Sequence, residues 1–202
     1  MKYKKQIIEI AKIMYSKGMV NAFEGNISIR DEEKIIITPS QICKGFLDVN
    51  MLMTIDRKGN ILEGSHKISS ETGLHLEAYA LKDDIRAVVH AHSPYATAYA
   101  IANKPIETKA YPEMIALFKK VPVIKYGTPS TEEVYSDLKN YINEYNVLLL
   151  ENHGIVAFGK DLYEAYFRLE SIESIAKVLL LNQLIGGPSD LPDEEVKKLL
   201  AW

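Results

Sequence analysis

Three of the five histidines in this 202-residue sequence stand where predicted strands end or turn. His90 and His92 close the apolar segment 87–92, and alternate residues of a strand share a face, so the two imidazoles lie about 6–7 Å apart along the chain. His153 falls in the turn Asn152-His153-Gly154 between two apolar strands. A lone histidine at a strand end is commonly an ordinary polar residue, but a pair closing an apolar strand needs partners. Three neutral imidazole nitrogens with one open position are typical of a catalytic zinc ion, so the spacing favours a metal site.

Polar residues that could hold a phosphate group precede a predicted helix. The run Ser69-Ser70-Glu71-Thr72 has the residue types of an ordinary helix cap, but free amides and hydroxyls at a helix N-terminus also bind phosphate. Gly25-Asn26 and Thr38-Pro39-Ser40 are likewise common turn signals. Taken singly, each motif is equally consistent with an ordinary turn and with a binding site. The remaining histidines, His66 and His75, fall in a loop and on a helix, with nothing around them to indicate a function.

Hydrophobic periodicity predicts strands and helices interleaved along the chain, without an internal repeat or linker. Three pairs of predicted strands are close enough to form hairpins, which favours an antiparallel or mixed sheet with helices on its faces. We therefore expect one α/β domain over residues 1–202. The predicted helices cover residues 2–17, 71–82, 95–102, 131–143 and 162–184, with short helices before 119 and from 192, and the predicted strands cover residues 27–30, 34–38, 51–56, 61–62, 87–92, 121–125, 147–151 and 155–158.

Composition excludes several classes of protein. The 24 Lys and Arg against 27 Asp and Glu give a net charge of −3, which offers no broad basic surface for nucleic acid. A hydrophobic content of 47% excludes a disordered chain. The single Cys43 cannot form an internal disulfide, which is typical of a reducing compartment. The N-terminal segment lacks the unbroken apolar stretch of a signal peptide, and no apolar run approaches the ~20 residues of a membrane span. We expect a soluble cytoplasmic protein with no membrane partner.

Taken in order, the motifs resemble those of the class II aldolase/adducin-head family. The resemblance extends from about residue 5 to about residue 185. Each motif is weak by itself, but five in the right order and spacing are highly specific. They are Glu24–Arg30 (EGNISIR), Ile37–Ser40 (ITPS), Ser69–Glu71 (SSE), Ala87–Ser93 (AVVHAHS) and Glu151–Gly154 (ENHG).

The resemblance implies a metal-dependent enzyme that cleaves a ketose 1-phosphate to dihydroxyacetone phosphate and an aldehyde such as lactaldehyde. It implies that His90, His92 and His153 bind one divalent metal ion per subunit, usually Zn²⁺. Glu71 matches the acid/base residue of the family, which also ligates the metal when substrate is absent. Tyr111 matches a tyrosine that reaches into the site of a neighbouring subunit. The positions that match the family's phosphate site are Gly25, Asn26, Ser40, Gln41, Ser69 and Ser70.

The same resemblance implies a single α/β/α three-layer domain with a largely antiparallel sheet, assembled as a homotetramer. Two departures bear on the substrate. Gln41 replaces the glycine that usually follows the Thr-Pro-Ser turn, which affects one backbone contact to phosphate, and the C-terminal tail 199–202 offers no match to a tyrosine that acts on the aldehyde.

Other activities occur on the same scaffold. A pentulose-5-phosphate 4-epimerase breaks the same kind of bond, and a methylthioribulose-1-phosphate dehydratase eliminates water instead. The adducin head is a structural module that lacks the metal ligands. Because all four ligand positions are filled here, the resemblance favours an enzyme.

Overall fold

The computed structural model describes residues 1–201 of the chain. Within them, eight strands form one sheet in the order β4-β3-β2-β1-β5-β8-β7-β6. Only the pairing of β6 with β7 is parallel, so the expected mainly antiparallel sheet is confirmed. The strands are β1 (Asn26–Asp31), β2 (Lys34–Ile37), β3 (Met53–Asp56), β4 (Ile61–Glu63), β5 (Ala87–Ala91), β6 (Val123–Ile124), β7 (Val147–Leu150) and β8 (Gly154–Gly159).

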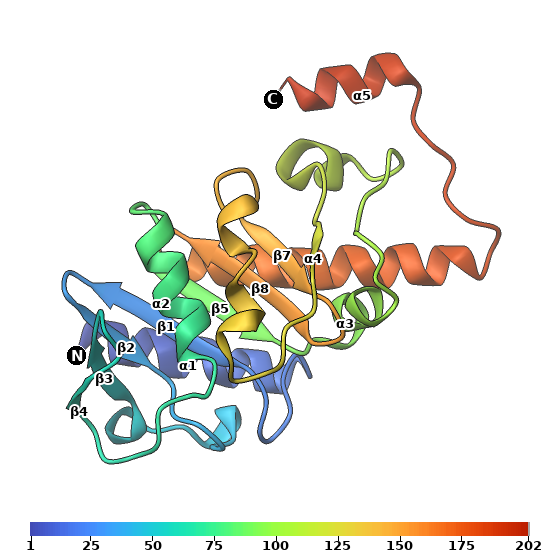
Figure 1. Cartoon of the computed structure of the whole chain (residues 1–202). Coiled ribbons are helices and arrows are strands. Elements are labelled where there is room, and N and C mark those ends of the chain that lie inside the picture. The colour runs from blue at the N-terminus through green and yellow to red at the C-terminus, as the bar shows by residue number, and fades with distance from the viewer. Residues whose placement is uncertain (202) are drawn as a thin grey trace.

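Helices cover both faces of the sheet, which gives the predicted α/β/α architecture (Figure 1). One face packs against α1, α3 and α4, and the other packs against α2 and the segment around residues 132–142. Strand β5 shows how alternation supplies both cores, because Val89 belongs to the first and Val88 to the second. The helices are α1 (Lys2–Ser16), α2 (Thr72–Leu81), α3 (Pro94–Ile101), α4 (Leu162–Gln183) and α5 (Asp193–Leu200).

The helix predicted for residues 131–143 is wrong. The chain instead makes two short 3₁₀ turns, η4 (Glu132–Tyr135) and η5 (Leu138–Asn140). The apolar spacing that suggested a helix is real, because Val134, Leu138 and Ile142 are all buried against the sheet. The residues between them are mostly Ser, Asp, Asn and Tyr, which favour a helix only weakly, so packing determines the backbone. The short helix expected before residue 119 is a π-type turn, η3 (Met114–Phe118).

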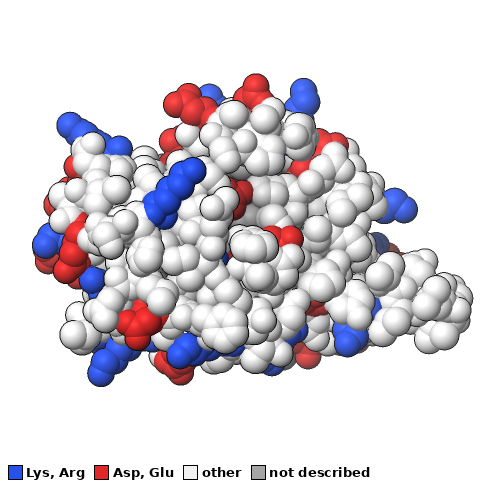
Figure 2. Space-filling model, turned by 90° about the horizontal axis from the view of Figure 1, so that it is seen from below, with Lys and Arg blue, Asp and Glu red and all other residues white. Residues whose placement is uncertain are grey.

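On the face shown in Figure 2, acidic and basic side chains are interspersed, without a broad basic patch. No helix in residues 1–201 is long and apolar enough to cross a bilayer.

Candidate metal centre

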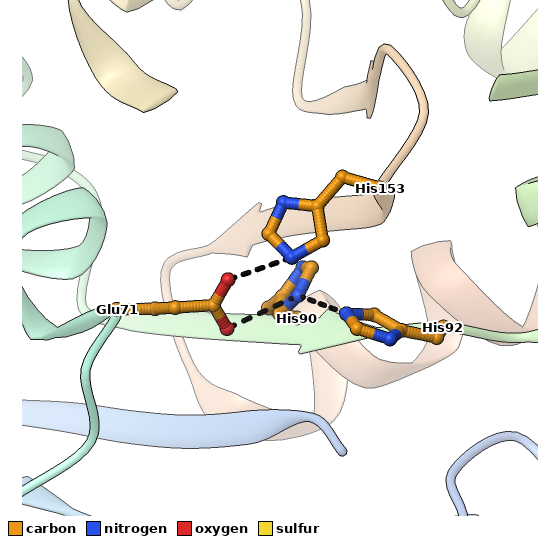
Figure 3. Close-up of side chains that lie close together, drawn as sticks. All are labelled: Glu71, His90, His92 and His153. Atoms are coloured by element: carbon orange, nitrogen blue, oxygen red, sulfur yellow. Dashed lines mark hydrogen bonds and ion pairs between the residues drawn. The ribbon is translucent and has the colours of Figure 1, made fainter. Parts of the chain in front are cut away.

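Four side chains from three distant parts of the chain converge at one end of the sheet (Figure 3). His90 lies in β5, and His92 follows the end of that strand. His153 lies in the turn between β7 and β8, and Glu71 immediately precedes α2. One potential ligand atom from each residue lies within 4.8 Å of the others. The structure therefore brings together the four side chains that the sequence and the family resemblance indicated as metal ligands.

Strand register positions the turn that carries His153. Strand β5 pairs with β8, and Ala91 lies opposite Ile155, so the turn that begins β8 sits beside the end of β5. Gly154 makes this approach possible. A Cβ atom at residue 154 would lie 2.5 Å from the carbonyl oxygen of Ala91 and 2.9 Å from the ring of His92, closer than atoms can pack. The glycine is therefore required by a backbone contact inside the site.

Nearby oxygen atoms indicate which ring nitrogen carries the proton in two of the histidines. Nδ1 of His90 lies 2.9 Å from the carbonyl oxygen of Ile155, so it carries the proton and leaves the Nε2 lone pair free. Nδ1 of His92 lies 3.6 Å from a carboxylate oxygen of Glu24, which favours the same tautomer there. The two Nε2 atoms are 3.1 Å apart. Lone pairs at this distance repel unless a cation lies close to both, so this donor set suits a divalent metal ion.

The carboxylate of Glu71 completes the cluster. Its Oε1 lies 2.8 Å from Nε2 of His153, and its Oε2 lies 3.3 Å from Nε2 of His90. Burial by itself raises the pKa of this carboxyl, but His90 and hydrogen bonds from His153 and Asn26 outweigh it, so the pKa lies well below its usual range. Burial lowers the pKa of His90 to about 3. A charged carboxylate beside a neutral imidazole is the protonation state in which both bind metals.

A chain of buried hydrogen bonds orients Glu71. Asn26 donates to Oε2 of Glu71 over 2.6 Å, and its own side-chain oxygen accepts from Nε2 of His75. Nδ1 of His75 in turn accepts from Ser28 at 2.6 Å, and Tyr79 contacts the same Ser28 hydroxyl at 2.6 Å. In this arrangement each group donates a hydrogen bond to the next group in the chain, and Asn26, the last donor, binds the carboxylate.

Sequence reasoning missed His75 and Glu24. His75 is fully buried, and burial lowers its pKa to about 4, so it is a neutral member of the network. The sequence did contain a signal for His75. It is a polar residue on the apolar face of a predicted helix, and Tyr79 lies four residues later on the same face. Glu24 belongs to a recognised motif, but nothing local indicated that its carboxylate would face His92.

The cluster opens onto a cavity of about 210 Å³. His92, His153 and Glu71 line one part of it. All six positions expected to hold phosphate also line it, namely Gly25, Asn26, Ser40, Gln41, Ser69 and Ser70. Ser69 also takes part in the start of α2, because its hydroxyl accepts a hydrogen bond from the amide of Glu71 over 3.3 Å and its carbonyl oxygen accepts one from the amide of Thr72.

Tyr111 does not join this site within one chain. It lines a separate groove of about 580 Å³ on the opposite helical layer, together with Tyr95 and residues of α4 such as Glu173. This groove is therefore distinct from the cluster of potential metal ligands.

Fold and site together define a member of a known enzyme superfamily. Residues 5–180 match the class II aldolase and adducin N-terminal domain family, and the chain belongs to that family. It is 35% identical over 182 residues to an L-fuculose phosphate aldolase from Methanocaldococcus jannaschii, covering 90% of this chain and 98% of the relative.

Two further comparisons describe how broad the relationship is. A solved structure of an L-fuculose 1-phosphate aldolase superposes with a TM-score of 0.90 at 31% identity, covering 99% of this chain and 95% of the other. A 3-oxo-tetronate 4-phosphate decarboxylase from Haemophilus influenzae is 33% identical, covering 97% of this chain and 95% of the relative. These relatives support lyase-type chemistry on sugar phosphates and leave the substrate of this chain to be proposed.

We expect wild-type protein to retain one divalent metal ion per chain after exhaustive dialysis. Replacing His92 with Ala removes a nitrogen ligand and should weaken metal binding by more than the roughly 10- to 100-fold typical of losing an outer partner. His66→Ala serves as the control, because His66 lies outside the cluster. Metal analysis of all three proteins measures the effect, and equal metal content in wild type and His92→Ala would contradict it.

Proposed function

We propose that this protein is a class II aldolase that cleaves a ketose 1-phosphate, such as L-fuculose 1-phosphate, to dihydroxyacetone phosphate and an aldehyde such as lactaldehyde. The observation that carries the proposal is the position of Glu71 between three histidine nitrogens and a cavity lined by Ser40, Ser69 and Ser70. The cavity thus offers hydroxyl donors for a phosphate group beside a cluster suited to a metal ion.

The metal is proposed to be Zn²⁺, since three imidazoles and one carboxylate are a common zinc donor set. Bound there, it supplies Lewis-acid stabilisation of the negative charge that develops on the substrate carbonyl oxygen. All the residues needed to hold it come from one chain. Glu71 would help to hold the ion in the absence of substrate, and its carboxylate would be available for proton transfer when substrate occupies the site.

Glu71 then acts as the acid/base at C3 of the substrate. When the C3–C4 bond breaks, the C4 hydroxyl gives up its proton and the electron pair moves towards the C2 carbonyl. Glu71, which takes up a proton from solvent, then delivers that proton to C3. In the condensation direction Glu71 removes that proton. Asn26 holds Oε2 of Glu71, so Oε1, which lies beside Nε2 of His153, is the oxygen that would face the substrate.

Tyr111 is proposed to act from a neighbouring subunit of a homotetramer, exchanging a proton with the oxygen at C4. Within one chain Tyr111 lies in the separate 580 Å³ groove, so it can reach a metal cluster only in another copy. Apolar side chains on the outer face of α4 and beyond it support assembly, because they are otherwise exposed to water. They include Phe167, Val178, Leu181, Leu184 and Ile185.

A panel of sugar phosphates tests the activity. We expect the metal-loaded protein to release dihydroxyacetone phosphate from L-fuculose 1-phosphate. The panel includes a pentulose 5-phosphate, methylthioribulose 1-phosphate and 3-oxo-tetronate 4-phosphate, with detection of the epimer, the dehydrated ketone and carbon dioxide. A faster reaction in one of those arms would replace the aldolase assignment, and no turnover by metal-loaded protein would favour a structural module.

Replacing Glu71 with Gln should slow the reaction by ~10²–10⁴-fold, because an amide cannot carry a proton between carbon and solvent. Solvent deuterium incorporation at C3 of dihydroxyacetone phosphate measures this step apart from bond cleavage. Metal content is matched between samples, and Glu77→Gln makes the same change within α2 as a control. Undiminished exchange in Glu71→Gln would remove Glu71 from the mechanism.

Mixed oligomers test the role of Tyr111. We expect Glu71→Gln and Tyr111→Phe proteins, each weakly active alone, to regain activity when dissociated and reassembled together. A mixed site can then combine Glu71 of one chain with Tyr111 of another. Mixing Glu71→Gln with His92→Ala is the control. Both of these chains carry an intact Tyr111 but a defective cluster, so no mixed site regains both Glu71 and His92 within one chain. A fully active monomer by sedimentation would refute the shared site.

A further inference from the structure

The loop that follows β2 carries a lysine into the cavity. The loop runs beside the Ser69-Ser70 segment, because Pro39 forms a bridge with Ile68 and the amide of Ser40 donates to the carbonyl oxygen of Lys67 over 2.9 Å. Lys44 begins the short helix η1 (Lys44–Phe46) and lines the 210 Å³ cavity.

Lys44 is buried without a charged partner. Its side chain is only 2% exposed. Its Nζ donates one hydrogen bond, over 3.0 Å, to the carbonyl oxygen of Ile42. Within residues 1–201, no carboxylate oxygen lies within 4.0 Å of this nitrogen to form an ion pair. An ammonium group has three N–H donors, so two remain for another acceptor. Burying a cation in this way is costly unless something neutralises it.

The backbone around Lys44 is held firmly in place. Gly45 packs on the ring of Tyr15 in α1, and a Cβ atom at residue 45 would lie 2.4 Å from that ring. Leu47, which follows η1, is buried in the core shared with α1. Gln41 adopts φ +55°, a left-handed conformation that costs a non-glycine residue energy. The loop is therefore built to keep its shape, and the lysine does not reach solvent.

We propose that Lys44 binds the phosphate group of the substrate and supplies the positive charge of a phosphate site whose other side-chain donors are neutral. This rests on the proposed function and adds a residue to it. A phosphate dianion has only acceptor oxygens and needs several donors around it. Lys44 shares the cavity with the hydroxyl groups of Ser40, Ser69 and Ser70, which are such donors. The phosphate site would thus combine neutral donors with one cation.

Titration of the lysine supports the same arrangement. Burial lowers the pKa of Lys44 to about 8, against smaller opposing effects of Cys43 and Glu71. A bound dianion would favour the charged form and raise this pKa again. Phosphate binding should therefore be coupled to protonation of Lys44 at alkaline pH.

Calorimetric titration of metal-loaded protein with inorganic phosphate tests the proposal without turnover. We expect Lys44→Met to bind phosphate roughly 10- to 100-fold more weakly than wild type, the loss expected for one charge-assisted hydrogen bond. Lys44→Arg, which keeps the charge, should lose far less. Lys67→Met is the matched control, because Lys67 is exposed on the adjacent loop. Metal content should be equal in all variants.

The pH dependence separates a charge effect from a loss of loop structure. Above the pKa of about 8, free wild-type Lys44 is neutral, so phosphate affinity should fall as the pH rises further, while Lys44→Met lacks this additional fall. Cys43→Ser should keep the wild-type dependence of phosphate affinity on pH, which excludes the neighbouring thiol as its source. Glu71 is present in every variant, so its effect on phosphate affinity is the same in all of them.

Each outcome is decisive. The role of Lys44 would be overturned if wild type and Lys44→Met bind phosphate equally well, or if wild type does not bind phosphate. It would also be overturned if the affinities of the two proteins fall in parallel as the pH rises. If Lys44→Met does not fold, the wild-type pH profile and Lys44→Arg still decide. If Lys44→Met loses phosphate binding and wild type shows no aldol cleavage, the phosphate-binding role of Lys44 stands and only the aldolase activity is refuted.

Discussion

The site depends on keeping neutral imidazoles and one charged carboxylate together in a buried pocket. His90 is fully buried, so its uncharged form is favoured, and its proton is committed to the carbonyl oxygen of Ile155. Glu71 keeps its charge because Asn26 and His153 donate to it. The facing Nε2 lone pairs of His90 and His92, 3.1 Å apart, repel each other unless a cation lies close to both. This geometry therefore suits a divalent cation, and the fold holds the donor groups in the protonation states that such an ion needs.

The sheet meets this requirement by joining both halves of the chain at β5. On one side β5 pairs with β1, where Asn26 lies opposite His90. On the other side it pairs with β8, whose preceding turn carries His153. The hydrogen-bond chain to Glu71 crosses from β1 to α2, so two layers of the fold fix one carboxylate. Small shifts in either pairing would separate the ligands, since a slip of one residue moves a side chain to the opposite face.

The cavity has two chemically different parts that suit the two ends of a sugar phosphate. Histidines and Glu71 form one part, and serine hydroxyls with Lys44 form the other. The first would stabilise charge that appears during bond cleavage, and the second would hold charge that is present throughout. In the proposed function, this division would let phosphate binding position the carbon skeleton without occupying the residues suited to a metal. A tyrosine from another subunit would complete the site on its open side.

Local pattern determined the elements and part of the site. The alternation of β5 placed His90 and His92 on one face, and nearly all helices and strands lie within a few residues of their predicted ranges. Only the tertiary structure decided the rest. Val134 and Leu138 have helical spacing, yet packing against the sheet bends them into 3₁₀ turns. His75 and Lys44 became part of the site through contacts with residues far away or through burial in a shared cavity. Periodicity reports which side of an element is apolar, whereas hydrogen-bond partners and burial depend on which elements meet, and that is set by long-range pairing.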